Sequence, residues 1–147
     1  MEPIYEQPMK TVVLVDDDDL VRGLVSRVLE RAGYRVLDAT TGEEGLELVE
    51  STLEADLLLT DVTLPGEVDG LELGRRALEE RSDLKLVCMS GYGREDLAEE
   101  LQSIAGTAVF LCKPFSNGEL VETVNRLLDD APRLNGKARA SESASGS

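Results

Sequence analysis

Five polar residues in this sequence each follow a short apolar run. Asp16 and Asp17 follow the first run, Asp61 follows a later one, and Ser90 and Lys113 follow two more. Continuous apolar runs are typical of strands that are buried on both faces, as in parallel sheets covered by helices. In such sheets the chemistry lies in the crevice beyond the carboxyl ends of the strands. We therefore expect these five side chains to meet at one site.

The types of these residues indicate phosphoryl chemistry. Three carboxylates held together repel one another, and a divalent cation relieves that repulsion. A hard ion such as Mg²⁺ binds one or two carboxylates and keeps several waters or phosphate oxygens. One carboxylate can then attack phosphorus and form an aspartyl phosphate. Lys113 would supply a point positive charge for the phosphate, and Ser90 would supply a hydroxyl donor. The set predicts an Mg²⁺ site with room for a phosphoryl group.

Each of these residues taken alone also fits a purely structural interpretation. Asp61 is typical of a residue that begins a turn, Ser90 is a common turn residue, and a single lysine usually lies on the surface. Two further acidic residues, Asp18 and Asp19, are expected to have only this structural role: either Asp18 or Asp19 caps the helix that follows, and the dipole of that helix favours the other. The joint placement of the five residues after apolar runs favours the functional interpretation.

Composition excludes several classes of function. The chain has 147 residues, 30 of them acidic and 15 basic, with a net charge of −15. This charge argues against binding to nucleic acid or to anionic lipid, which both require clustered basic residues. The chain has no histidine, which rules out His-based metal sites and a role as a phosphohistidine carrier. No apolar run approaches the ~20 residues of a membrane span, and the first ten residues lack a hydrophobic signal core. We expect a cytoplasmic protein that does not bind membranes.

Both cysteines, Cys88 and Cys112, lie inside apolar runs. The simplest expectation is that both are small buried hydrophobic residues in a reducing compartment. A disulfide between them is the less favoured alternative.

Apolar spacing along the chain predicts five strands alternating with five helices. The strands are expected at 11–15, 34–39, 56–60, 85–89 and 108–112, and the helices at 20–32, behind the capping box 41–44, at 71–80, at 95–104 and at 119–128. A second capping box is expected at 116–119, with Asp69 as a further N-cap and Gly33 closing the first helix. This alternation predicts an α/β fold with a doubly wound parallel sheet. We expect one domain at 10–131, between a flexible leader at 1–9 and a disordered tail at 132–147.

Four motifs follow one another along the chain: Val12–Asp17, Asp61–Pro65 with Asp69 and Gly70 behind it, Met89–Gly91 and Lys113–Phe115. In this order and at these spacings they resemble the response-regulator receiver domain of two-component signalling. The resemblance covers roughly residues 10–130. It implies a flavodoxin-like fold with strand order 2-1-3-4-5. It also implies that the protein is a signalling phosphoacceptor rather than an enzyme acting on a separate substrate, and that it promotes its own Mg²⁺-dependent phosphorylation and dephosphorylation.

The resemblance assigns a role to each motif. Asp61 would take the phosphoryl group from a phosphohistidine on a histidine kinase or a histidine phosphotransfer protein. Asp16 and Asp17 match the family's acidic pair, which with Asp61 and the backbone carbonyl of Thr63 would bind Mg²⁺. Lys113 matches the family's lysine at this position.

Further positions are expected to transmit or modulate the signal. By resemblance, Ser90 is the switch hydroxyl, and Phe110 stands at the aromatic switch position, where many relatives have Tyr. We hypothesise that Tyr92 shields the acyl phosphate from water, since it follows Ser90 closely between two glycines. The pattern 89–92 and a loop at 65–70 that is one residue longer than in compact receivers resemble receivers of hybrid histidine kinases. The downstream partner would be another protein, and no output domain is expected in this chain.

Two other functions fit parts of the pattern. A phosphatase of the haloacid-dehalogenase type also forms an aspartyl phosphate, but it requires a second Asp two positions later, where this chain has Thr63. A receiver that is never phosphorylated and acts only as an interaction module would keep the fold without using the site. Mg²⁺-dependent phosphorylation separates this last alternative from the favoured function.

Overall fold

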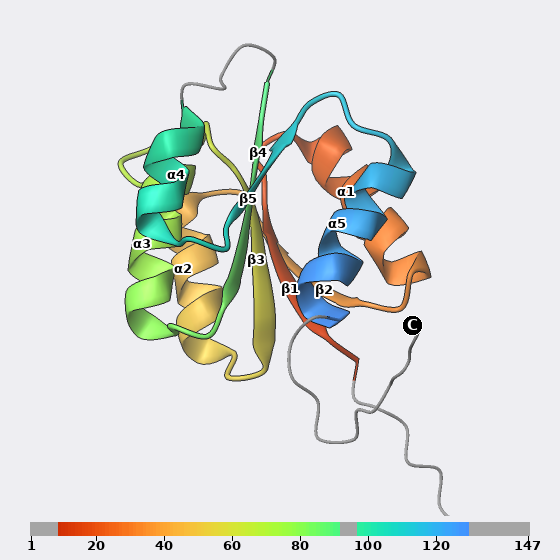
Figure 1. Cartoon of the computed structure of the whole chain (residues 1–147), viewed down its shortest axis with the longest axis horizontal. Coiled ribbons are helices and arrows are strands. Elements are labelled where there is room, and N and C mark those ends of the chain that lie inside the picture. The colour runs from red at the N-terminus through yellow and green to blue at the C-terminus, as the bar shows by residue number, and fades with distance from the viewer. Residues whose placement is uncertain (1–8, 92–96, 130–147) are drawn as a thin grey trace, which may run out of the picture.

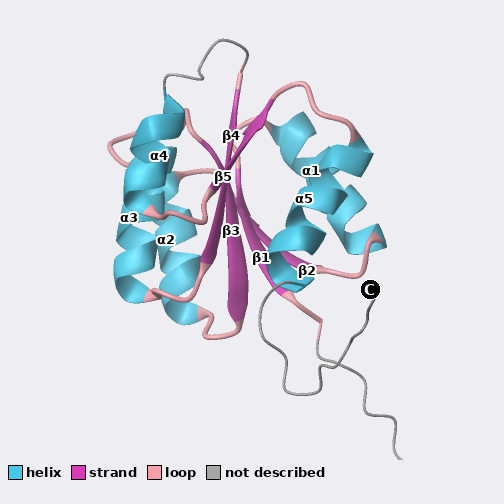
Figure 2. Cartoon of the chain, viewed as in Figure 1, coloured by secondary structure: helices cyan, strands magenta, loops and turns pink. Residues whose placement is uncertain are grey.

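A computed structural model of the chain describes residues 9–91 and 97–129. Five strands alternate with five helices there (Figure 2). The strands are β1 (Thr11–Val15), β2 (Arg35–Ala39), β3 (Ala55–Asp61), β4 (Lys85–Ser90) and β5 (Val109–Cys112). The helices are α1 (Asp19–Arg31), α2 (Gly42–Ser51), α3 (Gly70–Glu80), α4 (Ala98–Ile104) and α5 (Asn117–Asp129). The predicted elements are confirmed, with ends that differ by up to three residues in the described part of the chain.

The strands form one sheet in the order β2-β1-β3-β4-β5, and every neighbouring pair is parallel. Helices α1 and α5 cover one face of the sheet, while α2, α3 and α4 cover the other (Figure 1). This is the doubly wound arrangement with the predicted order 2-1-3-4-5. Its switch point lies between β1 and β3, where the chain reverses its direction across the sheet. No helix among the described residues has the length and apolar character needed to span a bilayer.

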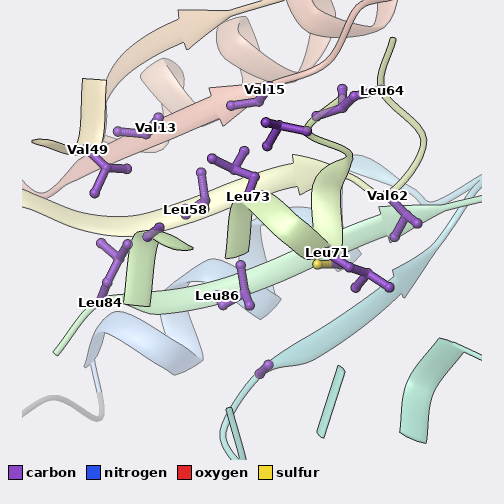
Figure 3. Packing of buried hydrophobic residues seen from close by; sticks show 14 of the residues in the cluster. Val13, Val15, Val49, Leu58, Val62, Leu64, Leu71, Leu73, Leu84 and Leu86 are labelled. Carbon is purple, nitrogen blue, oxygen red and sulfur yellow. The ribbon is translucent and has the colours of Figure 1, made fainter. Parts of the chain in front are cut away.

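Apolar residues of the strands alternate between two cores, one on each face. Val13, Val15 and Leu58 point into the core under α2, α3 and α4 (Figure 3). Val12 and Leu14 point into the core under α1 and α5. All five residues of β1 are buried. Burial of each such side chain contributes roughly 1.5–3 kcal/mol. A shift of one residue would exchange the two cores, so the register of the central strands is strongly fixed.

Side-chain caps fix where several helices begin. The carboxylate of Asp18 accepts from the amides of Leu20 and Val21, and that of Asp69 accepts from Glu72. These contacts confirm the predicted cap at Asp69 and show that Asp18, of the two candidates Asp18 and Asp19, caps α1.

Both predicted capping boxes have their N-cap bond. At the start of α5, the Ser116 hydroxyl accepts from the Glu119 amide while the Glu119 carboxylate accepts from the Ser116 amide. At the start of α2, the Thr41 hydroxyl accepts from the Glu44 amide. The Glu44 carboxylate also accepts from the amide of Thr40 at 3.0 Å, and backbone hydrogen bonds from Thr40 and Thr41 help to lower the pKa of Glu44.

The expectation for the cysteines is correct at one position and wrong at the other. Cys88 is buried in the core, and burial raises the pKa of its thiol to about 12, so this thiol is unreactive at neutral pH. Cys112 is exposed, because it is the last residue of β5 and β5 is an edge strand. Both thiols are free, so they form no disulfide.

Two strands are longer at their carboxyl ends than the apolar runs predict. Asp61 and Ser90 are themselves the last residues of β3 and β4. Asp61 is in register with Met89, whose carbonyl accepts from the Val62 amide at 2.8 Å. These two polar side chains are therefore held by the sheet itself and not by a loop. The predicted leader and tail lie almost wholly outside the described residues and stay predictions.

Gly70 allows the first turn of α3 to lie directly on the end of β3. A Cβ at this position would be 2.0 Å from the carbonyl oxygen of Asp61, which is backbone and cannot move aside. The Gly70 amide also donates to the carbonyl of Val62 at 2.8 Å. Only glycine permits this contact, and the contact fixes the backbone beside Asp61.

We predict that Gly70→Ala destabilises the protein by about 1–3 kcal/mol or more, the usual cost of overpacking. The measurement is the free energy of unfolding in urea. Gly23→Ala is the matched control, because a Cβ at Gly23 meets nothing within 4 Å and alanine in a helix interior gains roughly 0.5–1 kcal/mol over glycine. Equal effects of the two substitutions would contradict the proposed packing.

Candidate functional site

The carboxyl ends of four strands bring the predicted residues to one edge of the sheet. Asp16 and Asp17 follow β1, Asp61 ends β3, Ser90 ends β4 and Lys113 follows β5. Main-chain bonds tie these ends together, since the Lys113 amide donates to the Ser90 carbonyl at 2.7 Å. The structure thus brings together all five residues that the sequence analysis selected from the strand ends.

Three carboxylates form the centre of this site. One oxygen each from Asp16, Asp17 and Asp61 lie within 4.8 Å of one another. Their environments differ: Asp16 is fully buried, Asp17 is exposed, and the Asp61 side chain is 14% exposed. Hard carboxylate oxygens at this spacing are suited to a cation such as Mg²⁺. The Asp61 side chain is therefore mostly enclosed by protein but can still be reached from solvent.

Lys113 is the cation that contacts this cluster. Its Nζ lies 2.8 Å from Oδ2 of Asp61 and 3.4 Å from Oδ2 of Asp16. Burial by itself lowers the pKa of this ammonium. The hydrogen bond and the charge of Asp61, together with those of Asp16, raise the pKa by more than burial lowers it, so the net pKa is raised. Lys113 therefore stays charged at neutral pH and neutralises part of the carboxylate charge.

Burial makes the charged form of Asp16 unfavourable. Burial raises its pKa, and the nearby charge of Asp61 adds to this effect. The Asp18 amide, which donates to Oδ1 at 2.9 Å, and the Lys113 ammonium lower the pKa in part. The net pKa of Asp16 remains above its ordinary value.

The loop after β3 is fixed directly to the Asp61 side chain. Oδ1 of Asp61 accepts from the Thr63 amide at 2.9 Å. Thr63 is exposed and lies within the turn that leads to α3. The backbone carbonyl of Thr63 is the predicted Mg²⁺ ligand. It therefore belongs to a segment that is held against Asp61.

The two predicted switch residues lie on the same face of the sheet. Ser90 is 2% exposed, and its hydroxyl makes only a long 3.4 Å contact to the neighbouring Gly91 carbonyl within the described chain. Phe110 on β5 is half-buried and packs against the core under α3 and α4. Both side chains therefore lie on the sheet face that α2, α3 and α4 cover. Tyr92, the predicted shielding residue, lies outside the described residues.

Arg22 on α1 also contacts the site, although the sequence analysis did not select it. Its Nη1 donates to the backbone carbonyl of Asp16 at 2.9 Å. Its Nε and Nη2 contact carboxylates of Asp38 and Asp19. The spacing of Arg22 to Asp19, three residues along a helix, is visible in the sequence. The contacts to Asp16 and Asp38 depend on how α1 packs over the ends of β1 and β2.

An apolar groove lies between α1 and α5 beside the site. It has a volume of roughly 650 Å³, and Val21, Leu24, Val25, Phe115 and Leu120 contribute to its lining. Lys113 and Gly91 form its edge nearest the carboxylates. An apolar surface thus adjoins the charged cluster.

Comparison with known proteins agrees with this geometry. The family profile of the response regulator receiver domain matches residues 12–125. The sensor kinase CckA of Brucella abortus is 39% identical over 120 residues, which are 81% of this chain and 12% of that protein. The response regulator receiver protein CpdR of the same organism is 35% identical over 82% of this chain and 98% of its own length.

Solved structures show the same fold. The receiver domain protein of Methanospirillum hungatei, described as CheY-like, superimposes with a TM-score of 0.75 at 30% identity. The match covers 83% of this chain and 95% of that structure. The profile match, the relatives and the fold agree on one assignment. This chain belongs to the response regulator receiver domain family of two-component signalling.

Proposed function

We propose that Asp61 is the phosphoacceptor of this receiver domain. The observation that carries the proposal is the position of Asp61 at the end of β3, where its carboxylate lies beside the acidic pair and contacts the Lys113 ammonium at 2.8 Å. Acceptance of a phosphoryl group on an aspartate is general to the family. The partial exposure of Asp61 gives a donor access to the carboxylate.

In the proposed reaction, an oxygen of Asp61 forms a bond to phosphorus as the bond between phosphorus and the imidazole nitrogen of the donor breaks. The electron pair of the broken bond remains on the imidazole, so the products are an acyl phosphate and a free histidine. Lys113 offsets the negative charge that gathers on the phosphoryl oxygens. The Thr63 amide, which donates a hydrogen bond to Oδ1, holds the Asp61 side chain in one orientation before the reaction.

The donor set fits a magnesium ion. Asp16, Asp17, Asp61 and the backbone carbonyl of Thr63 would hold it, since all are hard oxygen ligands at one sheet edge. Bound Mg²⁺ would supply positive charge to the phosphoryl oxygens.

The phosphodonor in this proposal is a histidine kinase or a histidine phosphotransfer protein. The groove between α1 and α5 offers such a protein an apolar surface that ends at Lys113. The named relatives include both a sensor kinase, of which this chain spans 12%, and a receiver protein, of which it spans 98%. Attachment to a hybrid kinase stays a prediction.

The signal would leave the site through Ser90 and Phe110. The Ser90 hydroxyl has no short hydrogen bond to the described residues, so it is available to donate to a phosphoryl oxygen on Asp61. A movement of Ser90 would affect α4 and the half-buried Phe110, which pack on the same face. Such a change biases a two-state surface that a downstream protein recognises.

We predict that acetyl phosphate with Mg²⁺ adds one phosphoryl group to the wild-type protein and none to Asp61→Asn. The measurement is intact mass after incubation, with and without Mg²⁺. Asp69→Asn is a control, because Asp69 caps α3 and is not part of the acidic cluster.

An adduct that persists in Asp61→Asn would place the acceptor at another carboxylate. The lack of any adduct in the wild-type protein would favour the pure interaction module instead.

The acidic site is expected to cost stability. Since the folded-state pKa of Asp16 is raised above its ordinary value of 3.8, the charged form is penalised by folding. Any stability gained from this group is present below the unfolded pKa and is lost as pH rises through the folded pKa. At neutral pH the metal-free protein therefore carries the full penalty.

We predict that Asp16→Asn raises the Tm of the metal-free protein at pH 7 by about 3–6 °C, as expected for ~1 kcal/mol in a domain of this size. The gain should shrink as pH falls through the folded-state pKa of Asp16, where the wild-type side chain also becomes neutral. Thermal unfolding from pH 7 to pH 4 is the measurement. Asp17→Asn is the control, because Asp17 is exposed and its charge carries little burial cost.

In the same experiment, Mg²⁺ should stabilise the wild-type protein more than either variant. A lower Tm for Asp16→Asn at pH 7 would show that the Lys113 contact outweighs the cost of burial.

A further inference from the structure

We propose that Arg22 is a positioning residue that holds the turn between β1 and α1 in the shape needed to bind Mg²⁺. This inference rests on the proposed function, because it concerns the same acidic pair. It adds a residue outside the carboxylate cluster whose guanidinium acts through the backbone and not through contact with the metal.

The guanidinium joins three parts of the chain. Nη1 donates to the Asp16 carbonyl at 2.9 Å, Nε lies 3.2 Å from Oδ2 of Asp38, and Nη2 lies 2.8 Å from Oδ1 of Asp19. The Arg22 side chain is only 16% exposed. A second bond links the same elements, since the Asp16 amide donates to the Ala39 carbonyl at the end of β2. The backbone of Asp16 is thus held on both sides.

The bonded carbonyl belongs to the peptide that joins Asp16 to Asp17. Its direction determines the orientation of the Asp17 backbone and so the direction of the Asp17 side chain. The carboxylates of Asp16 and Asp61 have hydrogen bonds of their own. The described residues provide no such bond to the exposed Asp17 carboxylate, which depends on its backbone for its position.

A role for the positive charge alone would have the opposite effect on Mg²⁺. A cation beside the acidic cluster repels a second cation, so removal of a charge that acted only through space would tighten Mg²⁺ binding. Removal of a positioning contact would weaken it. A lysine would keep the charge but lose the planar arrangement of donors that reaches three acceptors at once. The sign of the change therefore separates the two roles.

The test is the Kd for Mg²⁺ by isothermal titration calorimetry on the whole chain. We expect Arg22→Met and Arg22→Lys to bind Mg²⁺ about 10-fold more weakly than wild type, at the low end of the 10–100-fold effects known for residues that orient metal ligands. Arg27→Met is the matched control: Arg27 is an exposed residue on the same helix and contacts none of the acidic cluster. Its Kd should be unchanged or slightly lower.

A second readout needs no metal. In the metal-free protein, the Asp18 amide that donates to Asp16 should exchange with solvent faster in Arg22→Met and Arg22→Lys than in Arg27→Met.

Three outcomes would overturn the inference. Unchanged or tighter Mg²⁺ binding by Arg22→Met would assign only a charge effect to Arg22. A lower Tm with an unchanged Kd would assign it only to the stability of α1, and Arg22→Lys gives the same comparison if Arg22→Met does not fold. Absence of Mg²⁺ binding by the wild-type protein would instead reject the proposed function, and this inference with it.

Discussion

Repulsion among three carboxylates at one edge of the sheet is the constraint that the rest of the site accommodates. Asp16, Asp17 and Asp61 offer oxygens within 4.8 Å of one another. Lys113 reduces this repulsion through its short contact to Asp61 and its longer contact to Asp16. Backbone amides also stabilise the carboxylate charges, because the Asp18 amide donates to Asp16 and the Thr63 amide donates to Asp61. A cluster of this kind is suited to an incoming cation and a phosphoryl group.

The sheet makes this concentration of charge possible. The strands that carry it are buried on both faces and their register is fixed by two separate cores. Because the carboxyl ends of parallel strands lie together, residues far apart in sequence are held at or directly beyond the end of a rigid strand. Close packing of Gly70 on the backbone of Asp61 extends the same rigidity to the start of α3. The apolar framework thus holds charged groups where they would not gather by themselves.

In the proposed function, the stability of the fold and the binding of a cation place opposite demands on Asp16. Its burial raises the pKa of the carboxyl, so the native state gives up stability to keep a charge there. The contacts of Arg22 and Ala39 to the Asp16 backbone show that the fold also holds this residue firmly. A buried and fixed ligand loses little conformational entropy when it binds a metal. The lost stability is therefore consistent with a site prepared in advance.

The sequence by itself determined the elements and the residues at their ends. Apolar runs mark the strands. Because these runs are continuous, they indicate strands that are buried on both faces, as in a parallel sheet. The polar residues after those runs marked the site, since Asp61 and Lys113 stand at strand ends in any α/β fold of this order. Local hydrogen bonding also placed the caps at Asp18 and Asp69, because a helix N-terminus lacks partners wherever it occurs.

Only the tertiary structure decided which of these residues touch and how much water reaches them. The contact between Lys113 and Asp61 joins residues 52 apart in sequence. The different burial of Asp16 and Asp17, adjacent residues of one type, depends on how α1 lies over the end of β1. The exposure of Cys112 follows from the edge position of β5, and the contacts of Arg22 follow from the meeting of β1, β2 and α1. Contact and solvation are properties of packed neighbours, and a local pattern of residue types does not contain them.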